Sequence, residues 1–243
     1  MAADGDSSRF EAIVLGAGPA GEIVATRLGE RGMRTALVEA ELVGGECAYW
    51  ACIPSKTLLR PGEVRFEADR APGTTRPEQR WKEIAAYRDF MIRNLDDSRE
   101  IESYAKRGVS VVKGHGRLAD PGKVEVGDRV LQSERIVIAT GSEPMLPPIP
   151  GLGEIGYWTN RQATTFAEPP ESAVVLGGGP VGIELAQLLR RLGARVHVVE
   201  SANRLLARGG QITRDELMTL EGQDIRVSRV FRQTEPGGAA TDA

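Results

Sequence analysis

A repeated glycine-rich segment constrains the fold of this chain more than any other feature. Residues 11–39 (EAIVLGAGPAGEIVATRLGERGMRTALVE) and residues 172–200 (SAVVLGGGPVGIELAQLLRRLGARVHVVE) follow one pattern, at a constant offset of 161 positions. The residues matched at that offset are Gly16 with Gly177, Gly18 with Gly179, Pro19 with Pro180, Gly21 with Gly182, and Glu39 with Glu200. Two copies of one supersecondary pattern predict two similar folding units.

Each copy has the order strand, glycine turn, helix, strand. An apolar, β-branched run predicts a buried strand at residues 12–15 and again at 173–176. The helical segments that follow carry apolar residues three and four apart, and Gly32 and Gly193 suit helix C-caps. We therefore predict an α/β fold of two Rossmann-like units with parallel sheets and right-handed connections, the second unit being incomplete.

The region between the copies has a different character. We predict a helix that begins at residues 54–59, a loop over 69–80, and a long charged helix over 81–106 that Gly108 ends. Short strands are expected at residues 109–112, 124–126, 129–131 and 135–138.

A stiff, proline-rich segment, PMLPPIPG (144–151), predicts the domain boundary. This gives one domain over residues 1–150 and a second, partial domain over 151–243. The pattern decays after Leu206, apart from strand-like residues at 225–230, and a disordered tail is expected from about residue 232.

The glycine motifs indicate dinucleotide binding, because each one follows a predicted strand, opens a predicted helix and precedes an acidic residue. The first glycine permits the tight turn, the second lets the backbone approach a pyrophosphate, and the third allows close packing of helix and strand. Glu39 and Glu200 would bind ribose hydroxyls. A carboxylate in the second copy repels a 2′-phosphate, which favours NADH over NADPH, although Arg204 nearby weakens that preference. The alternative is that both glutamates are ordinary charges at strand ends.

The chain has two cysteines, Cys47 and Cys52, in the segment GGECAYWACIPSKTLL (44–59). Two cysteines do not make a disulfide scaffold for a chain of 243 residues, and the plain alternative is a pair of buried, inert thiols. We expect both on one helical stretch. A bond between positions five apart on a helix would be distorted and therefore reducible, which suits redox chemistry. A position near a helix N-terminus would also lower the thiol pKa.

This segment resembles the redox motif of the pyridine nucleotide–disulfide oxidoreductases, GGTCxNxGCIPSK. The chain keeps the two glycines, both cysteines and the IPSK run (53–56), and the segment IVIATGSEPMLPPIPG (136–151) resembles the strand and ATG motif of that family. The resemblance implies FAD on the first copy and NADH on the second. It also implies electron flow from NADH through FAD to the Cys47–Cys52 disulfide and then to a small-molecule or protein disulfide.

The resemblance implies roles for individual residues. Cys52 would lie against the flavin as the charge-transfer thiolate, and Cys47 would exchange with the substrate. Lys56 would sit near flavin N5, paired with Glu184, and Gly116 would contact the adenine side. The candidate cofactor-binding residues are Gly16, Gly18, Pro19, Ala20, Gly21, Glu39, Gly45, Glu46, Lys56, Gly116, Ala139, Thr140, Gly141, Gly177, Gly179, Pro180, Val181, Gly182 and Glu200.

The chain also departs from the family pattern. Glu46 replaces the usual threonine, and the run Tyr49–Ala51 replaces Asn-x-Gly, which adds bulk between the cysteines and changes the expected flavin pocket or substrate access. The family's interface domain, with its His–Glu acid/base pair, has no match here, so a monomer or a partner-dependent protein is expected. A fragment, a truncated gene product and a complete short protein all remain open.

Composition excludes several classes of function. The net charge is −3 without a long basic run, and aromatic residues make up 5%, which disfavours nucleic acid as a partner. The chain has neither a signal-like start nor an apolar run of about twenty residues, so a cytosolic location without membrane contact is expected, and no metal site is expected.

Three functions compete on these observations. The first is an NADH-dependent, FAD-containing disulfide oxidoreductase. The second is a catalytically incomplete nucleotide-binding remnant, and the third is an NADH diaphorase without disulfide turnover. Reduction of bound flavin by NADH argues against the second, and its survival in Cys52→Ser would fit the third.

Overall fold

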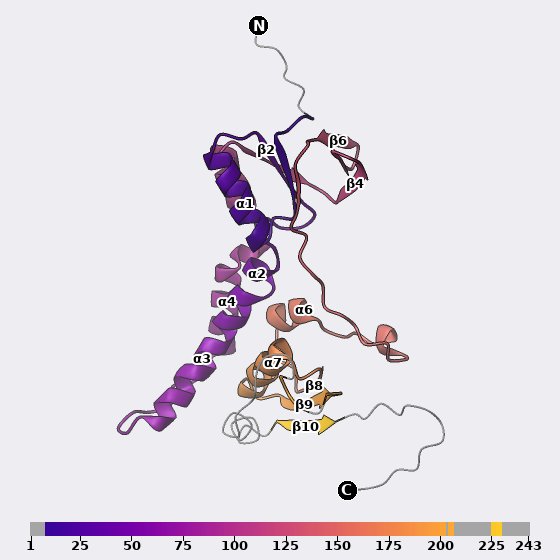
Figure 1. Cartoon of the computed structure of the whole chain (residues 1–243). Helices are drawn as coiled ribbons and strands as arrows, with labels where there is room; N and C mark the ends of the chain where they lie inside the picture. Colours follow the sequence, from indigo (N-terminus) through magenta and orange to yellow (C-terminus); the bar gives the residue numbers. More distant parts are fainter. Residues whose placement is uncertain (1–7, 203, 207–224, 230–243) are drawn as a thin grey trace, which may run out of the picture. The chain divides into compact units, whose positions relative to one another are not determined.

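The computed structural model describes residues 8–202, 204–206 and 225–229. The chain divides into two compact units (Figure 1). The first unit takes residues within 1–57 and 85–165, and the second takes residues within 58–84 and 166–243. The helices α3 (Cys52–Arg70) and α4 (Trp81–Met91) contribute residues to both. Along the chain, the first compact unit ends at residue 165 and the second continues from residue 166. The boundary predicted at residue 150 from the proline-rich segment concerns functional domains and stays a prediction.

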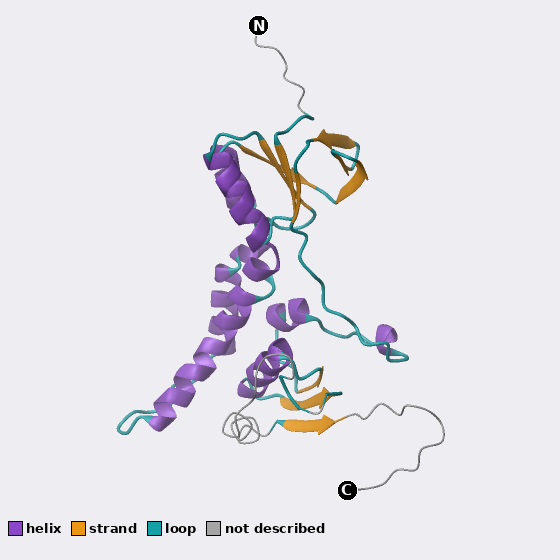
Figure 2. Cartoon of the chain, in the orientation of Figure 1, coloured by secondary structure: helices purple, strands orange, loops and turns teal. Residues whose placement is uncertain are grey.

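The first unit is built on a four-stranded parallel sheet, in the order β3-β2-β1-β7. A three-stranded antiparallel sheet, in the order β4-β5-β6, accompanies it (Figure 2). The remaining elements of the unit are helical. The elements are β1 (Ala12–Leu15), α1 (Pro19–Glu30), β2 (Thr35–Glu39), α2 (Gly45–Tyr49), η1 (Arg93–Leu95), α5 (Ser98–Lys106), β3 (Val109–Lys113), β4 (Gly116–Asp120), β5 (Lys123–Val126), β6 (Arg129–Gln132), β7 (Ile136–Ile138), η2 (Leu152–Glu154) and α6 (Asn160–Thr165).

The parallel sheet is buried on both faces, because its side chains alternate between two cores. Val14 and Leu37 pack with Ala25 of α1 and Tyr104 of α5. The other face packs against the antiparallel sheet, through Ile13, Leu15, Ala36, Val38, Val112, Val124, Val126 and Leu131. Continuous apolar strands are the pattern expected for a parallel sheet covered on both sides.

The second unit contains a three-stranded parallel sheet, in the order β10-β9-β8, and helix α7. Its elements are β8 (Ser172–Leu176), α7 (Pro180–Arg191), β9 (Arg195–Glu200) and β10 (Arg226–Arg229). Apolar side chains of α7 pack on β9, where Ile183, Ala186 and Leu189 meet Val196 and Val198. Residues from 230 onward, including the expected tail, lie outside the described residues.

The repeat predicted from the sequence has the same backbone register in both copies. Ala12 pairs with Thr35 in the first sheet, and Ala173 pairs with Val196 in the second, each displaced by 161 positions. Both helices begin at the motif proline and end close to Gly32 or Gly193, each with positive φ. The prediction of two Rossmann-like α/β units is confirmed.

The long helix predicted over residues 81–106 is wrong, because the chain breaks it between α4 and α5. Arg93, Asn94 and Leu95 have φ of +53°, +51° and +61°, so three successive residues leave the right-handed helical region. Asp96 then accepts a hydrogen bond of 2.9 Å from the amide of Ser98, where α5 begins. The charged, helical pattern of residues 81–106 gives no indication of this break. Strand β4 was also not predicted.

Candidate functional site

The three glycines of the first loop are each required for a different reason. Gly16 has φ of +94°, and a Cβ there would lie 2.3 Å from the carbonyl oxygen of Ala139. A Cβ on Gly21 would lie 1.8 Å from the carbonyl oxygen of Gly16, so helix α1 approaches the turn too closely for any side chain. A Cβ on Gly18 would have no atom within 4 Å. Gly18 therefore leaves open space beside the start of α1, as a bound pyrophosphate requires.

The second loop repeats this arrangement. Gly177 has φ of +104°, and a Cβ on Gly182 would lie 2.2 Å from the carbonyl oxygen of Gly177. A Cβ on Gly179 would have nothing within 4 Å. Pro180 and Val181 form the first turn of α7, as Pro19 and Ala20 form that of α1. Both loops thus have the geometry of the dinucleotide motif.

The two glutamates hold their loops in the same way. Glu39 accepts hydrogen bonds from the amide of Ala17 and from the amide two residues farther along the chain, both at 2.7 Å. Glu200 accepts from the amides of Gly178, at 2.6 Å, and of Ala202, at 2.7 Å, 161 positions later. Each carboxylate oxygen keeps a second lone pair for a ribose hydroxyl. The loops therefore fit a nucleotide. The two glutamates are more than charges at strand ends, because each one bonds to the backbone of its loop.

Backbone amides also set the charge of the second glutamate. The hydrogen bond from Ala202, followed by that from Gly178, lowers the pKa of Glu200 below its ordinary value, although partial burial opposes this. The carboxylate is therefore ionised at neutral pH.

The cysteine motif lies directly on the first glycine loop. The amide of Gly44 donates a hydrogen bond of 2.8 Å to the carbonyl oxygen of Ala17, and a Cβ on Gly45 would lie 2.7 Å from the Cα of Gly18. Gly44 and Gly45 have φ of +124° and +60°, which favour glycine. The glycine pair thus brings the cysteine segment against the loop that suits a pyrophosphate.

The two cysteines do not share one helix, so that prediction is wrong. Cys47 lies within α2 and Cys52 opens α3, with the break at Trp50 and Ala51. The carbonyl oxygen of Trp50 accepts side-chain hydrogen bonds from Asn160 and Thr164, both at 3.1 Å. The residue four positions later is Pro54, which has no amide hydrogen to donate to that carbonyl as a continuous helix would require. Both cysteines are free thiols in this structure, with Cys52 exposed and Cys47 half-buried.

A lowered thiol pKa was expected near a helix N-terminus, and for Cys47 this is wrong. A hydrogen bond with Cys52 and then burial raise the pKa of Cys47 to about 11. The two thiols are therefore in contact, and Cys47 holds its proton at neutral pH.

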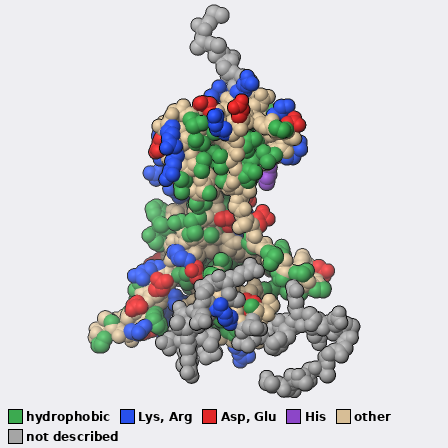
Figure 3. Space-filling model, in the orientation of Figure 1, with side chains coloured by type: hydrophobic (Ala, Val, Ile, Leu, Met, Phe, Trp, Pro, Cys, Tyr) green, Lys and Arg blue, Asp and Glu red, His purple; other side chains and the backbone are tan. Residues whose placement is uncertain are grey.

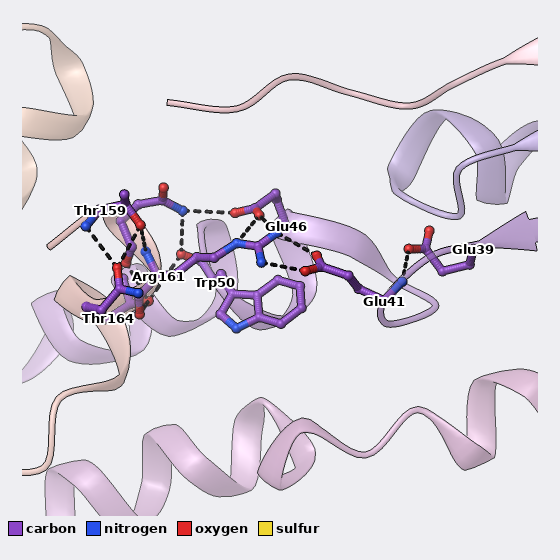
Figure 4. Close-up of polar contacts among 9 residues, drawn as sticks. Glu39, Glu41, Glu46, Trp50, Thr159, Arg161 and Thr164 are labelled. Atoms are coloured by element: carbon purple, nitrogen blue, oxygen red, sulfur yellow. Dashed lines mark hydrogen bonds and ion pairs between the residues drawn. The ribbon is translucent and has the colours of Figure 1, made fainter. Parts of the chain in front are cut away.

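The bulk added between the cysteines is absorbed by packing. Tyr49 is 2% exposed, and its hydroxyl donates to the carbonyl oxygen of Val43 at 3.2 Å. Burial raises the pKa of that hydroxyl. The tyrosine ring also fills the space above Gly44, where a Cβ would lie 2.9 Å from the ring. Trp50 packs against Arg161 (Figure 4).

Other predicted site residues lie close to the first loop or to β1. Thr140 and Gly141 follow Ala139, whose amide donates to the carbonyl oxygen of Leu15 at 2.8 Å beside the first loop. Gly116 opens β4, where a Cβ would lie 2.9 Å from Leu15. Two catalytic candidates lie in different units. Lys56 is exposed on the first-unit part of α3, and Glu184 lies on α7 of the second unit, so their pairing stays a prediction.

Sequence reasoning missed the residues that hold the cysteine segment from outside. Buried Asp97 accepts from the amide of Val43 at 2.8 Å and from the ammonium of Lys113 at 2.7 Å. Arg161 donates a hydrogen bond of 2.6 Å to Glu46. No local pattern marks such partners, because 54 and 115 residues separate them from the motif in the sequence. The departures at Glu46 and Trp50 were the only available signal.

The two histidines were not expected to serve as acid/base groups. His197 lies on β9 and makes a hydrogen bond of 2.8 Å with Ser228 on β10, which is a structural role. Among the residues that the structure describes, no group of three or more His, Cys, Asp or Glu side chains could hold a metal ion. Over the same residues, helices long and apolar enough to cross a bilayer are absent. The face drawn in Figure 3 carries charged side chains of both signs.

The sequence model described as pyridine nucleotide-disulphide oxidoreductase matches residues 10–235.

Curated relatives agree with this match. The chain is 28% identical to a mercuric reductase of Staphylococcus aureus, over 98% of this chain and 44% of that protein. It is 32% identical to a dihydrolipoyl dehydrogenase of Acholeplasma laidlawii, over 82% of this chain and 62% of that protein. It is 34% identical to a dihydrolipoyl dehydrogenase of Thermus scotoductus, over 84% and 45%. The chain thus spans about half the length of most of these relatives.

Solved structures support the fold. The HOCl-induced flavoprotein disulfide reductase RclA from Escherichia coli superposes with a TM-score of 0.79 at 24% identity, covering 90% of this chain and 49% of that one. Its Cu(II) complex superposes with a TM-score of 0.80, covering 91% of this chain.

Proposed function

Because the chain belongs to the pyridine nucleotide-disulphide oxidoreductase family, we propose that it is a flavoprotein that transfers electrons between a nicotinamide nucleotide and a disulfide. FAD would occupy the first glycine loop and NADH the second. The observation that carries the proposal is the contact between the cysteine motif and the first loop, where Gly45 packs on Gly18 and Gly44 bonds to Ala17.

The residues of the chain would divide the chemistry as follows. Bound FAD supplies two-electron transfer between hydride and thiol chemistry. Cys52 would face the flavin in the role of the charge-transfer thiolate that the family resemblance implies, whereas Cys47 holds its proton at neutral pH. Cys47 would exchange with the disulfide substrate, and Lys56 with Glu184 would adjust the charge near the flavin. Each turnover would move two electrons to the Cys47–Cys52 disulfide, which would take up one proton as it opens to the Cys47 thiol and the Cys52 thiolate.

The second loop supports a preference for NADH over NADPH. Glu200 is held by backbone amides and is ionised, so it would accept hydrogen bonds from ribose hydroxyls and repel a 2′-phosphate. Arg204 follows four residues later, and its positive charge would reduce this discrimination.

An absorbance experiment tests the proposal. The purified chain is reconstituted with FAD and titrated anaerobically with NADH, then with dithionite. We expect a flavin spectrum and, after two-electron reduction, a long-wavelength charge-transfer band. Cys52→Ser should lose that band, whereas Cys47→Ser should keep it. A chain that takes up no FAD would contradict the proposal and favour a nucleotide-binding remnant. Flavin reduction without a band in the unmodified chain would favour a diaphorase.

A further inference from the structure

Arg161 on α6 connects that helix to residues 41–50, more than a hundred positions earlier in the sequence. Its guanidinium lies between two carboxylates and over an indole ring (Figure 4). Nε donates to Glu46 at 2.6 Å, and the two terminal nitrogens donate to both oxygens of Glu41, at 2.8 and 2.6 Å. The carbon of the guanidinium lies 4.2 Å from the centre of the Trp50 ring. These contacts use the planar fork and the flat face of arginine together.

Two of these partners belong to the cysteine motif, and both are departures from the family pattern. Glu46 precedes Cys47 directly on α2, and Trp50 ends that helix. Asn160 strengthens the attachment, because its amide donates to Glu46 at 2.9 Å and to the carbonyl oxygen of Trp50 at 3.1 Å. Helix α6 is therefore hydrogen-bonded to α2 at both ends of the segment that carries Cys47.

The cluster differs from an ordinary surface ion pair. The side chains of Arg161, Glu41 and Glu46 are 32%, 47% and 35% exposed, so water screens them only in part. Hydrogen bonding to Glu41 raises the pKa of Arg161, and the same bond lowers the pKa of Glu41. A bidentate, stacked and networked arginine keeps one geometry, which an isolated exposed pair does not.

The contacts from α6 also fix the break between α2 and α3, which lies between the two thiols. The carbonyl of Trp50 points to side chains of α6, and Cys52 begins the next helix two residues later. Because Cys47 and Cys52 lie on either side of this break, the geometry of the break decides how they meet.

We propose that Arg161 is a positioning residue that holds Cys47 against Cys52 and thereby favours disulfide formation. The inference rests on the proposed function, in which this pair is the redox centre. Holding two reacting groups in place raises their effective concentration. Removal of Arg161 should therefore shift the equilibrium from disulfide toward dithiol.

The test uses the whole chain without flavin, equilibrated with mixtures of reduced and oxidised dithiothreitol. Two electrons and two protons pass from Cys47 and Cys52 to oxidised dithiothreitol, so the protein disulfide forms as the dithiothreitol ring opens. We expect Arg161→Ala to lower the equilibrium constant for the protein disulfide about tenfold, which is about 30 mV. Arg161→Lys should lower it nearly as far, because lysine keeps the charge and loses the fork.

Matched variants separate positioning from charge and from folding. Glu46→Gln, which frees α2 and preserves side-chain size, should shift the equilibrium several-fold. Glu41→Gln removes another partner of Arg161 that lies outside the motif, and Arg117→Ala breaks an ion pair with Glu125 on the antiparallel sheet. Glu41→Gln should shift the equilibrium less than Glu46→Gln, because Arg161 keeps its contacts with the motif, and Arg117→Ala should stay within about twofold of the unmodified chain.

Several outcomes would overturn the proposal. One is an unchanged equilibrium in both Arg161→Ala and Glu46→Gln. Another is full rescue by lysine, which would assign the effect to charge alone. A shift in Glu41→Gln equal to that in Glu46→Gln would also overturn it. If circular dichroism shows that Arg161→Ala does not fold, the equilibria of Glu46→Gln and Arg161→Lys test the proposal in its place. Failure to bind FAD would contradict only the proposed function, because this equilibrium needs no flavin.

Discussion

The two copies of the repeat share their loops but differ in what surrounds them. In the first copy, Gly16 packs against residues 139–140, and Gly44 and Gly45 close over the loop. In the second copy, a Cβ on Gly177 would meet nothing within 4 Å. The loop geometry is thus a property of the repeat itself, whereas the cysteine motif is an addition to one copy.

The strands differ in the same sense. Leu15 on β1 is 4% exposed, and the equivalent Leu176 on β8 is 44% exposed. The first strand lies between helices and a second sheet, while only one face of β8 packs on a described core. The comparison teaches that the repeat specifies backbone and ligand geometry locally, and that burial depends on what the rest of the chain adds.

The largest expected effect separates a structural glycine from a ligand-facing one. Gly21→Ala places a Cβ against the carbonyl oxygen of Gly16 and should destabilise the first unit by about 3 kcal/mol or more. Gly18→Ala meets no atom and should leave stability within about 0.5 kcal/mol, while it weakens FAD binding.

Urea unfolding and FAD titration of the two glycine variants give both numbers. Gly182→Ala and Gly179→Ala repeat the contrast in the second copy, with NADH in place of FAD. Equal stability of Gly21→Ala and Gly18→Ala would contradict the packing role of the third glycine.

The second effect tests the difference in burial. Leu15→Ala should cost about 3 kcal/mol, because it leaves a cavity between two packed layers. Leu176→Ala should cost less than about 1 kcal/mol, since nearly half of that side chain already contacts solvent. Hydrogen exchange of the β1 and β8 amides measures each copy separately. Similar losses at both positions would show that β8 is covered in solution.

Sequence alone predicted the repeat well, because its signals are local. The apolar strands, the prolines that begin α1 and α7 and the glycines that end them are read from neighbouring residues. The roles assigned to Gly16, Gly18 and Gly21 also match their surroundings. At Gly16 and Gly21 these are backbone requirements that only glycine satisfies, whereas Gly18 leaves room for a ligand.

The sequence could not predict features that depend on distant partners. The side chains that bond to the carbonyl of Trp50 at the break between the cysteines belong to Asn160 and Thr164, more than a hundred residues away. The raised pKa of Cys47 follows from its contact with Cys52. An argument from the helix dipole does not include that contact. Tyr49 adds bulk between the cysteines in the sequence but lies buried in the structure.

The third effect separates the nucleotide bound by the first copy from the nucleotide bound by the second. Glu39→Gln should weaken FAD binding about tenfold and leave NADH binding nearly unchanged, because a charged acceptor is lost from one ribose site. Glu200→Gln or Glu200→Ala should do the reverse. Calorimetric titration of both variants with both nucleotides checks this. Equal loss of both cofactors in either variant would contradict the assignment of one nucleotide to each copy.

The smallest effect concerns acid stability of the second loop. Backbone hydrogen bonds from Ala202 and Gly178 lower the folded-state pKa of Glu200. A group with a depressed folded pKa stabilises the fold above its unfolded pKa, about 4.3, and this contribution is lost as the pH falls through the folded value. The Tm advantage over Glu200→Gln should be no more than about 2 °C near pH 6 and should vanish as the pH falls below about 4. Thermal scans of both proteins across that range measure the difference, and parallel pH profiles would mean that these amides do not favour the ionised carboxylate.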